Sequence, residues 1–362
     1  MQRGISRPIA FFLGGLMALL MNRLTYPETQ PAMQHQQFVT SEHLMENAEP
    51  FRKKPAEVAK EPDQKNAPAG GGEGIVVTDT YVRPKLEWVD ANHAMPSQKE
   101  VTSTCQTRLL VLIMSDARQQ WKRDAQRESW AVDVARYATL GVNKADFKYV
   151  FILGRLFDQI PDKVVQEAHK ARDIIVSDIN DYDIDGATNK SVWALRWALQ
   201  HCTFTHVLKT MDHAFVNVPL IISQWLPRME AGSYFAGHRL TDVVVNRDPN
   251  LNWYISEEDY PKSKYPTYPQ QDYVLSRDVA DDLVKVMNRT FTRIYYDDVA
   301  VAHALATGKP KLSLQHEPNV IHLCTPAVSR PYVVLKVLEA ADMKKYGADM
   351  FSKQIICHLS RK

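Results

Sequence analysis

Short apolar runs that alternate with helical segments dominate the chain from residue 105 onward, and they constrain its fold more than any other feature. The runs at 108–114, 146–153, 173–177 and 205–209 are rich in strand-forming residues and too short for ordinary helices. Helical segments are expected around 121–130, 164–170 and 188–200. Strands that alternate with helices build βαβ units around a mostly parallel sheet. The sequence therefore predicts an α/β domain over 105–362, with ligands bound at the carboxyl ends of its strands.

The composition excludes several classes of protein. Of the 362 residues, 45% are hydrophobic and 24% are charged, which are ordinary globular values. Lys+Arg 44 against Asp+Glu 42 gives a formal net charge of +2, so no basic surface for nucleic acid is expected. The four cysteines form no C-x-x-C pair, which argues against both a structural zinc site and a disulfide-dense mini-protein.

An apolar run near the N-terminus raises the question of a membrane anchor. Arg3 and Arg7 precede the run at 9–21, which is short for a transmembrane helix. Because no small-x-small cleavage site follows, we favour an uncleaved signal-anchor over 9–24, with residues 1–8 as a cytosolic tail. A cleaved signal peptide and a buried apolar segment are the alternatives.

Residues 25–104 have the composition of a flexible stem. Pro, Gln, Glu, Lys and Ala dominate, and three glycines stand at 70–72. Such a stretch buries too little apolar surface to offset the entropy of ordering it. We expect it to tether a lumenal domain to the membrane.

Two glycosylation sequons agree with a lumenal body, Asn189-Lys-Ser and Asn288-Arg-Thr. In that oxidising compartment the cysteines can form up to two disulfides of undetermined connectivity. They are Cys105, Cys202, Cys324 and Cys357.

Several segments carry a specific resemblance. Residues 123–130 read R-D-A-Q-R-E-S-W, 150–154 read V-F-I-L-G, and 209–217 read K-T-M-D-H-A-F-V-N. With 173–191, 253–276 and the D-D-V at 297–299, they form six segments in one order. This order resembles the β1,3-galactosyltransferase / β1,3-N-acetylglucosaminyltransferase family (glycosyltransferase family 31), whose motifs include R-x-A-I-R-x-T-W, K-x-D-D-D-x-F-V-N and E-D-V. The resemblance covers about 105–310.

The resemblance implies a GT-A fold (a Rossmann-like sheet flanked by helices) and a single-pass type II topology in the Golgi membrane. It also implies a metal-dependent, inverting transfer of galactose or an N-acetylhexosamine from a UDP-sugar, most often UDP-galactose, to a sugar 3-hydroxyl. The acceptor would be a glycan on lipid or protein. The alternative is a catalytically inactive family member that acts as a Golgi binding or chaperone subunit. An unrelated secreted α/β protein is the third interpretation.

Inverting transfer needs a carboxylate that takes the proton of the acceptor hydroxyl. By resemblance, Asp298 matches the aspartate of E-D-V, the family's general base. Without the resemblance, Asp297 and Asp298 read as the cap of a helix over 299–306, because aspartate favours that position.

The family places a Mn²⁺ or Mg²⁺ ion on its D-D-D aspartates, where this chain has Met211-Asp212-His213. We expect Asp212 and His213 to bind the ion, since imidazole also binds Mn²⁺. A late histidine completes the family's metal site, and His322 is the candidate, with His316 as a weaker one. The presence of His213 in place of the family's last aspartate equally fits a lost metal site.

Two further departures concern glycines. Pro269-Gln-Gln-Asp272 stands where the family has C-S-G-G-G, and Ala302 replaces a later glycine. These bulkier residues alter one wall of the expected cleft.

Residues expected to bind the donor nucleotide lie at the strand ends or match family positions. They are Ser115, Arg118, Arg123, Arg127, Asp178, Lys190, Lys209 and Asp212. Trp130, at helical spacing from Arg123 and Arg127, is instead predicted to be a core residue.

Overall fold

The structure is a computed structural model of the whole chain. It describes residues 101, 105–132, 134–143, 146–157, 159–181, 186–229, 232–250, 254–288, 294, 296–321, 334–336 and 340–351. The predicted tail and signal-anchor, and the stem apart from Val101, lie outside this part, so they stay predictions. Among the described helices, none combines the length and the apolar character needed to cross a bilayer.

A central sheet organises the domain. Within the described residues it has seven strands in the order β3-β2-β1-β4-β7-β6-β8. Its strands are β1 (Gln106–Met114), β2 (Phe147–Arg155), β3 (Ile174–Asn180), β4 (Thr203–Met211), β6 (Phe235–Leu240), β7 (Tyr268–Ser276) and β8 (Gln315–His316). Strands β3, β2, β1 and β4 run parallel to one another, whereas β7 pairs antiparallel with both β4 and β6. The four strands predicted from the sequence are confirmed, and each is longer than predicted by one to four residues.

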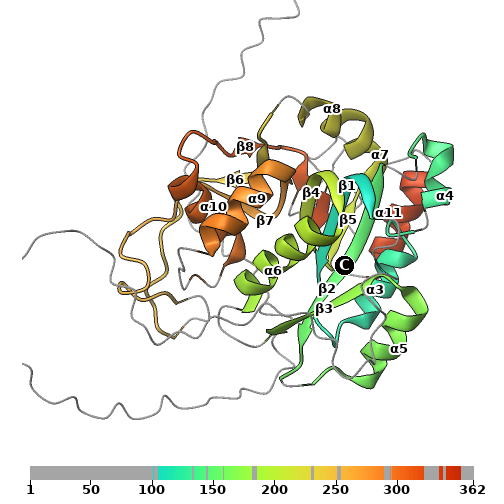
Figure 1. Cartoon of the computed structure of the whole chain (residues 1–362), viewed down its shortest axis with the longest axis horizontal. Helices are drawn as coiled ribbons and strands as arrows, with labels where there is room; N and C mark the ends of the chain where they lie inside the picture. The colour runs from blue at the N-terminus through green and yellow to red at the C-terminus, as the bar shows by residue number, and fades with distance from the viewer. Residues whose placement is uncertain are drawn as a thin grey trace, which may run out of the picture. The chain divides into compact units, whose positions relative to one another are not determined.

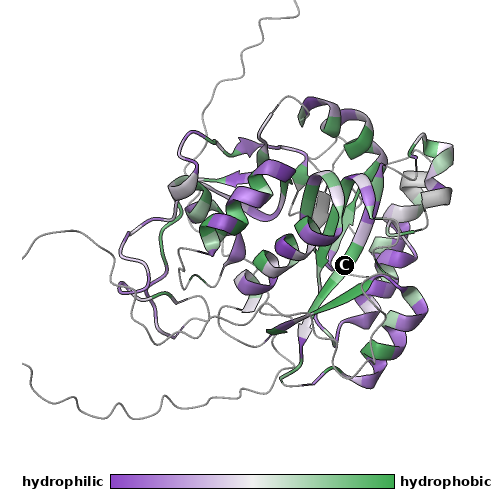
Figure 2. Cartoon of the chain, in the orientation of Figure 1, coloured by the Kyte–Doolittle hydropathy of each residue, from purple (hydrophilic) through white to green (hydrophobic). Residues whose placement is uncertain are grey.

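Helices cover both faces of this sheet (Figure 1). One layer consists of α6 (Gly186–His201), α9 (Arg277–Met287) and α10 (Asp297–Gly308). The other consists of α3 (Gln120–Arg127), α5 (Asp162–Ala171) and α11 (Ala340–Phe351). Alternate residues of β1 belong to two hydrophobic cores, one on each face of the sheet. Leu109 and Val111 pack with the second helical layer. Leu110 and Leu112 pack with the first. Burial on both faces explains why the strands are almost continuously hydrophobic (Figure 2).

Shorter elements complete the described part. They are α4 (Val134–Tyr137), η2 (Ala138–Leu140), β5 (Ala214–Val216), α7 (Val218–Leu220), the π-helical turn η3 (Ile221–Trp225), α8 (Leu226–Met229), β9 (Val320–Ile321) and β10 (Val334–Lys336). Strands β5, β10 and β9 form a small separate sheet. The sheet order and the two helical layers confirm the α/β, GT-A type architecture predicted from the sequence.

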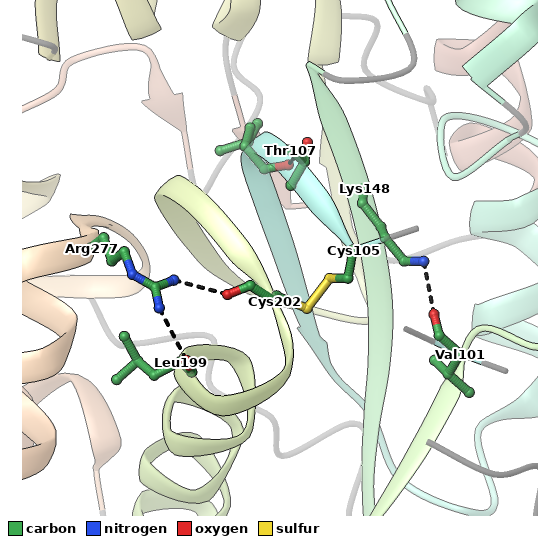
Figure 3. The surroundings of a disulfide bond; sticks show 8 residues. Val101, Cys105, Thr107, Lys148, Leu199, Cys202 and Arg277 are labelled. Atoms are coloured by element: carbon green, nitrogen blue, oxygen red, sulfur yellow. Dashed lines mark hydrogen bonds between the residues drawn. A yellow bond between two sulfur atoms is a disulfide. The ribbon is translucent and has the colours of Figure 1, made fainter. Parts of the chain in front are cut away.

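A disulfide joins Cys105, just before β1, to Cys202, between α6 and β4 (Figure 3). Arg277, the first residue of α9, donates hydrogen bonds to the carbonyl oxygens of Cys202 and Leu199, which ties α9 to the same corner. The structure therefore settles one pair that the sequence left open. Cys324 and Cys357 lie outside the described residues.

Candidate active site

The carboxyl ends of β1 and β4 lie side by side, because Met114 pairs with Met211 in the parallel ladder. Ser115 and Asp212 follow these residues, and both side chains are buried. Ser115 Oγ donates a hydrogen bond of 2.9 Å to Asp212 Oδ2. The backbone N–H of Asp212 donates to Met114 O at 3.0 Å. Two predicted donor-binding residues, 97 positions apart in sequence, therefore meet at the edge where ligands of parallel sheets bind.

Arg123 fixes this corner from behind. It is fully buried, and its Nη1 donates to Ser115 Oγ at 2.9 Å and to Asp116 O at 2.7 Å. Its Nε and Nη2 donate to the two carboxylate oxygens of Glu167 at 2.8 and 2.6 Å. Burial acts to raise the pKa of Glu167, but the two neighbouring guanidinium groups outweigh burial and lower it. Arg123 thus positions the turn after β1, and direct contact with the donor stays a prediction.

Arg127 and Arg118 are also engaged with carboxylates. Arg127 forms a bidentate pair with Asp173, at 2.9 and 2.8 Å, and Arg118 forms one with Asp116, at 3.1 and 3.0 Å. The Arg127 side chain is mostly buried, whereas that of Arg118 is 50% exposed. Of the two, Arg118 is the one that solvent and a ligand can reach.

Lys190 of α6 reaches the same edge from the other helical layer. Its Nζ donates to Ser115 O at 2.9 Å and forms an ion pair with Asp181. Asp181 Oδ2 accepts from the N–H of Gly154 at 3.1 Å, and a Cβ on Gly154 would stand only 2.3 Å from Asp181 Oδ1. The same Cβ would stand 2.6 Å from the backbone oxygen of Ile179, so glycine is required at this position. Asp178 forms an ion pair with Arg155 at 2.8 Å, beside this group.

Asp298 lies in the first turn of α10 and is 5% exposed. Its Oδ1 accepts from the N–H of Val299 at 2.8 Å, and its Oδ2 accepts from the N–H of Gln271 at 3.0 Å. Burial, followed by the adjacent charge of Asp297, raises the pKa of Asp298 to about 7. Tyr296 occupies the N-cap position, so neither aspartate is the cap residue that the simpler interpretation expected. A carboxyl with such a pKa accepts a proton effectively near neutral pH.

Asp297, the residue before Asp298, forms a buried ion pair with Lys209. Lys209 is 1% exposed, and its Nζ lies 2.7 Å from Asp297 Oδ2. The same ammonium donates to Gln271 O at 3.0 Å, and Ser191 Oγ donates to Asp297 Oδ2 at 2.9 Å. Lys209 and Lys190 are thus both buried within networks and are not surface charges.

The backbone of Gln271 contacts both Asp298 and Lys209: its N–H donates to the Asp298 carboxylate, and its carbonyl oxygen accepts from the Lys209 ammonium. Its φ of 49° lies in the left-handed region that favours glycine, which agrees with the glycines of the resembling family at this segment. The substitution by glutamine therefore keeps the backbone geometry while adding a side chain. Its Oε1 is buried and has no hydrogen-bond partner within the described residues.

Two groups of residues result, and α6 links them. We call Ser115, Lys190, Asp181 and Asp212 the phosphate-side cluster, and Lys209, Gln271, Asp297 and Asp298 the base cluster. Lys190 contacts the first and its neighbour Ser191 contacts the second. Lys209 in β4 and Asp212, the residue directly after this strand, make the same connection. The sequence prediction omits Asp181, Asp297 and Gln271 as site residues. These three residues are identified by their contacts with residues that are distant in sequence, and such contacts cannot be inferred from the local sequence.

A cavity of about 310 Å³ adjoins α10. Ala302, one helical turn after Asp298, lines it together with Thr267 and Arg239. Asp298 itself does not line this cavity, which is bounded by later residues of the same helix, Ala302, Leu305 and Ala306.

The remaining predicted residues are distributed as follows. Trp130 is fully buried and its Nε1 donates to Ala214 O at 3.0 Å, which confirms its core role. Asn288 is exposed at the end of α9, whereas Asn189 is half-buried in α6. His316 lies on the edge strand β8, beside His238. His322 lies outside the described residues.

The predicted metal ligands Asp212 and His213 have other groups close to their donor atoms. His213 Nδ1 lies 3.8 Å from Asp212 Oδ1, and Lys122 Nζ lies 3.6 Å from the same oxygen. The other oxygen, Oδ2, is taken by Ser115. No group of three His, Cys, Asp or Glu side chains suited to a metal ion occurs in the described part of the chain. Among the described residues, one carboxylate that already faces an ammonium group does not fit a Mn²⁺ or Mg²⁺ ion, which prefers several oxygen ligands; the predicted third ligand, His322, is not one of the described residues.

Comparison with known proteins adds an independent observation. A sequence profile of the family described as Galactosyltransferase matches residues 121–317. β-1,3-galactosyltransferase 2 of Mus musculus is 29% identical over 210 residues, which cover 55% of this chain and 47% of that protein. β-1,3-galactosyltransferase 1 of Mus musculus is 30% identical over 205 residues, covering 54% of this chain and 59% of that protein. The chain thus aligns with about half the length of these relatives.

A solved structure of a glycosyltransferase involved in the glycosylation of the major capsid of PBCV-1 superposes with a TM-score of 0.35 and 9% identity, covering 67% of this chain and 98% of that chain.

Proposed function

The chain belongs to the galactosyltransferase family, and on that premise we propose that it transfers galactose from UDP-galactose to a sugar 3-hydroxyl in β1,3 linkage. The observation that carries this proposal is Asp298, a buried carboxyl whose pKa is raised to about 7 and whose two oxygens are oriented by backbone amides. The acceptor is a glycan on lipid or protein.

The proposed reaction is a single displacement. The acceptor 3-hydroxyl attacks the anomeric carbon of the donor and gives its proton to Asp298, while the bond from that carbon to the β-phosphate oxygen breaks and UDP leaves. Because attack and departure occur on opposite faces of the sugar, the configuration inverts. The cavity lined by Ala302, one helical turn after Asp298, supports an acceptor site near this part of α10.

UDP is proposed to bind at the phosphate-side cluster. Ser115 and Lys190 stand at the carboxyl end of β1, and α3 begins directly after it. Helix N-termini and lysines both favour phosphate groups. Because the donor atoms around Asp212 do not fit a divalent cation, the proposed reaction includes no step that involves one. The Mn²⁺ ion implied by the family resemblance stays a prediction.

We further propose a single-pass type II protein in the Golgi membrane with a lumenal catalytic domain. The apolar run after Arg3 and Arg7 supports this orientation. The Cys105–Cys202 disulfide suits an oxidising compartment, and exposed Asn288 offers a glycosylation site there.

A donor-by-acceptor screen on the detergent-purified full chain tests the function. UDP-galactose, UDP-N-acetylglucosamine and UDP-N-acetylgalactosamine are each incubated with acceptors that end in different sugars, and UDP release and product linkage are measured. Transfer of galactose in β1,3 linkage is expected, and it should disappear in Asp298→Asn. UDP binding without transfer to any acceptor would instead favour the inactive binding subunit.

A further inference from the structure

Lys122 is a buried ammonium group that its surroundings leave incompletely paired. It lies in the first turn of α3, and its side chain is 10% exposed. Its Nζ lies 3.6 Å from Asp212 Oδ1 and 5.5 Å from the ring centre of Trp121. In the described part of the chain, no hydrogen bond from this Nζ is recorded. An ammonium group carries three N–H donors, and burying them unused is unfavourable.

The position of this ammonium indicates what its partner is. Lys122 follows the carboxyl end of β1 by eight residues and sits where α3 begins, which is the place where sheets of this kind bind phosphate groups. Ser115 and Lys190 meet at the same edge. The nearby cations of Arg118 and Lys190 already have carboxylate partners in Asp116 and Asp181. Lys122 also faces a carboxylate, that of Asp212, but at 3.6 Å and without a hydrogen bond among the described residues, so its N–H groups remain available to an incoming anion.

The Lys122 ammonium lies beside Asp212 Oδ1, where a metal ion bound to this carboxylate would lie. Asp212 is held by Ser115 and by the N–H bond to Met114, so its Oδ1 is fixed toward Lys122. A divalent cation bound to Oδ1 would stand next to the ammonium and would be repelled by it. A lysine bound to Oδ1 can instead bridge the carboxylate and a phosphate.

We propose that the Lys122 ammonium, held by Asp212, takes the place of a divalent cation and binds the diphosphate of the nucleotide donor. This inference rests on the proposed function. During transfer, the electron pair of the breaking bond moves to the β-phosphate oxygen, and the N–H groups of Lys122 stabilise the negative charge that develops there. Lys122 itself gives up no proton in this step, because the proton of the acceptor hydroxyl goes to Asp298, and no group is oxidised or reduced.

UDP binding to the full chain, measured by calorimetry at fixed ionic strength, tests the proposal without relying on activity. The affinity of the wild-type protein in EDTA is expected to equal its affinity in Mn²⁺. Lys122→Met should weaken UDP binding by about 10- to 100-fold, the effect of one charge-assisted hydrogen-bonded contact. Lys122→Arg should retain most of the affinity, because the charge and the donors remain.

The matched control is Lys163→Met, which removes an exposed lysine from α5 and should leave the affinity unchanged. Thermal unfolding of Lys122→Met checks that the variant is folded. Wild-type binding that requires Mn²⁺, or full affinity in folded Lys122→Met, would overturn this inference and leave the proposed function standing. Binding in neither EDTA nor Mn²⁺ would overturn both.

Discussion

Replacing Asp298 by asparagine separates the charge of this side chain from its shape. In the folded protein, its two oxygens accept hydrogen bonds from the N–H groups of Val299 and Gln271 at 2.8 and 3.0 Å. Asparagine preserves one acceptor and turns the other into an NH₂ group, which faces a backbone N–H as a second donor. One hydrogen bond is lost and two donors face each other, which costs about 1–3 kcal/mol of folding free energy.

The loss of charge acts in the opposite direction. Burial, and then the charge of Asp297, raises the pKa of Asp298 from 3.8 to about 7. A difference of one pKa unit corresponds to about 1.4 kcal/mol, so ionising this carboxyl in the folded protein costs on the order of 4 kcal/mol. Because the folded state has the higher pKa, it binds more protons than the unfolded state, and stability falls as the pH rises from about 4 to about 7.

The two effects predict a dependence on pH for Asp298→Asn. At pH 4 the wild-type carboxyl is neutral, so only the lost hydrogen bond counts and the variant should be less stable by about 1–3 kcal/mol. At pH 8 the variant avoids the buried charge and should be as stable as the wild-type protein or more so. Urea unfolding at both pH values measures this difference.

Catalysis should respond in the opposite sense. Wild-type transfer is expected to rise as the pH passes through about 7, because Asp298 must be ionised to take the proton. Asp298→Asn should lower the transfer rate by about 10²- to 10⁴-fold while UDP binding stays unchanged. Near-full transfer by the folded variant would refute the assignment of the base.

Asp297→Asn is the contrasting variant. It removes the charge that pairs directly with Lys209, which is 1% exposed, and leaves Asp298 as the other aspartate whose charge acts on this ammonium. We expect a loss of at most about 3–5 kcal/mol of stability, so transfer must be compared per folded molecule. If this variant abolishes transfer while Asp298→Asn does not, the base is Asp297.

Three further predictions concern the frame of the site. Cys105→Ser should destabilise the fold by about 4 kcal/mol, because the bond to Cys202 closes a loop of about 100 residues; urea unfolding of the oxidised protein measures this loss. Gln271→Gly should change stability by no more than about 1 kcal/mol and preserve transfer, since glycine adopts a φ of 49° without strain; activity and thermal unfolding check both. Glu167→Gln should cost about 3–5 kcal/mol in urea unfolding, because Arg123 is fully buried and loses its counter-charge.

The parallel half of the sheet was predictable because burial on both faces leaves a local signal. Residues 108–114 and 146–153 are nearly uninterrupted apolar runs, as expected for strands between two helical layers. Strand β7 gave no such signal: it begins Tyr268-Pro-Gln-Gln-Asp272, and its antiparallel partners are set by long-range pairing. The disulfide between Cys105 and Cys202 was likewise undetermined, because four cysteines allow several pairings.

The site was predictable where a single residue carries the signal and unpredictable where a pair does. The resemblance pointed to Asp298 and Lys209 by their motifs. It gave no indication that Lys209 pairs with Asp297, or that Lys122 lies beside Asp212, because such contacts join segments about 90 residues apart. From the sequence, Lys122 looks like any charged residue near the start of a helix.

The base cluster and the phosphate-side cluster meet different needs of the proposed reaction, which requires both. At the base cluster, two aspartates share one buried lysine, so a negative charge is in excess and Asp298 holds a proton readily. At the phosphate-side cluster, Lys122 has donors that its one carboxylate partner does not use. A displacement needs this polarity, because a proton is taken up at one end while negative charge develops on the diphosphate at the other. Since Lys209 lies near the end of β4 and Asp212 is the residue that follows the strand, the two ends of the reaction are held at the carboxyl end of one strand.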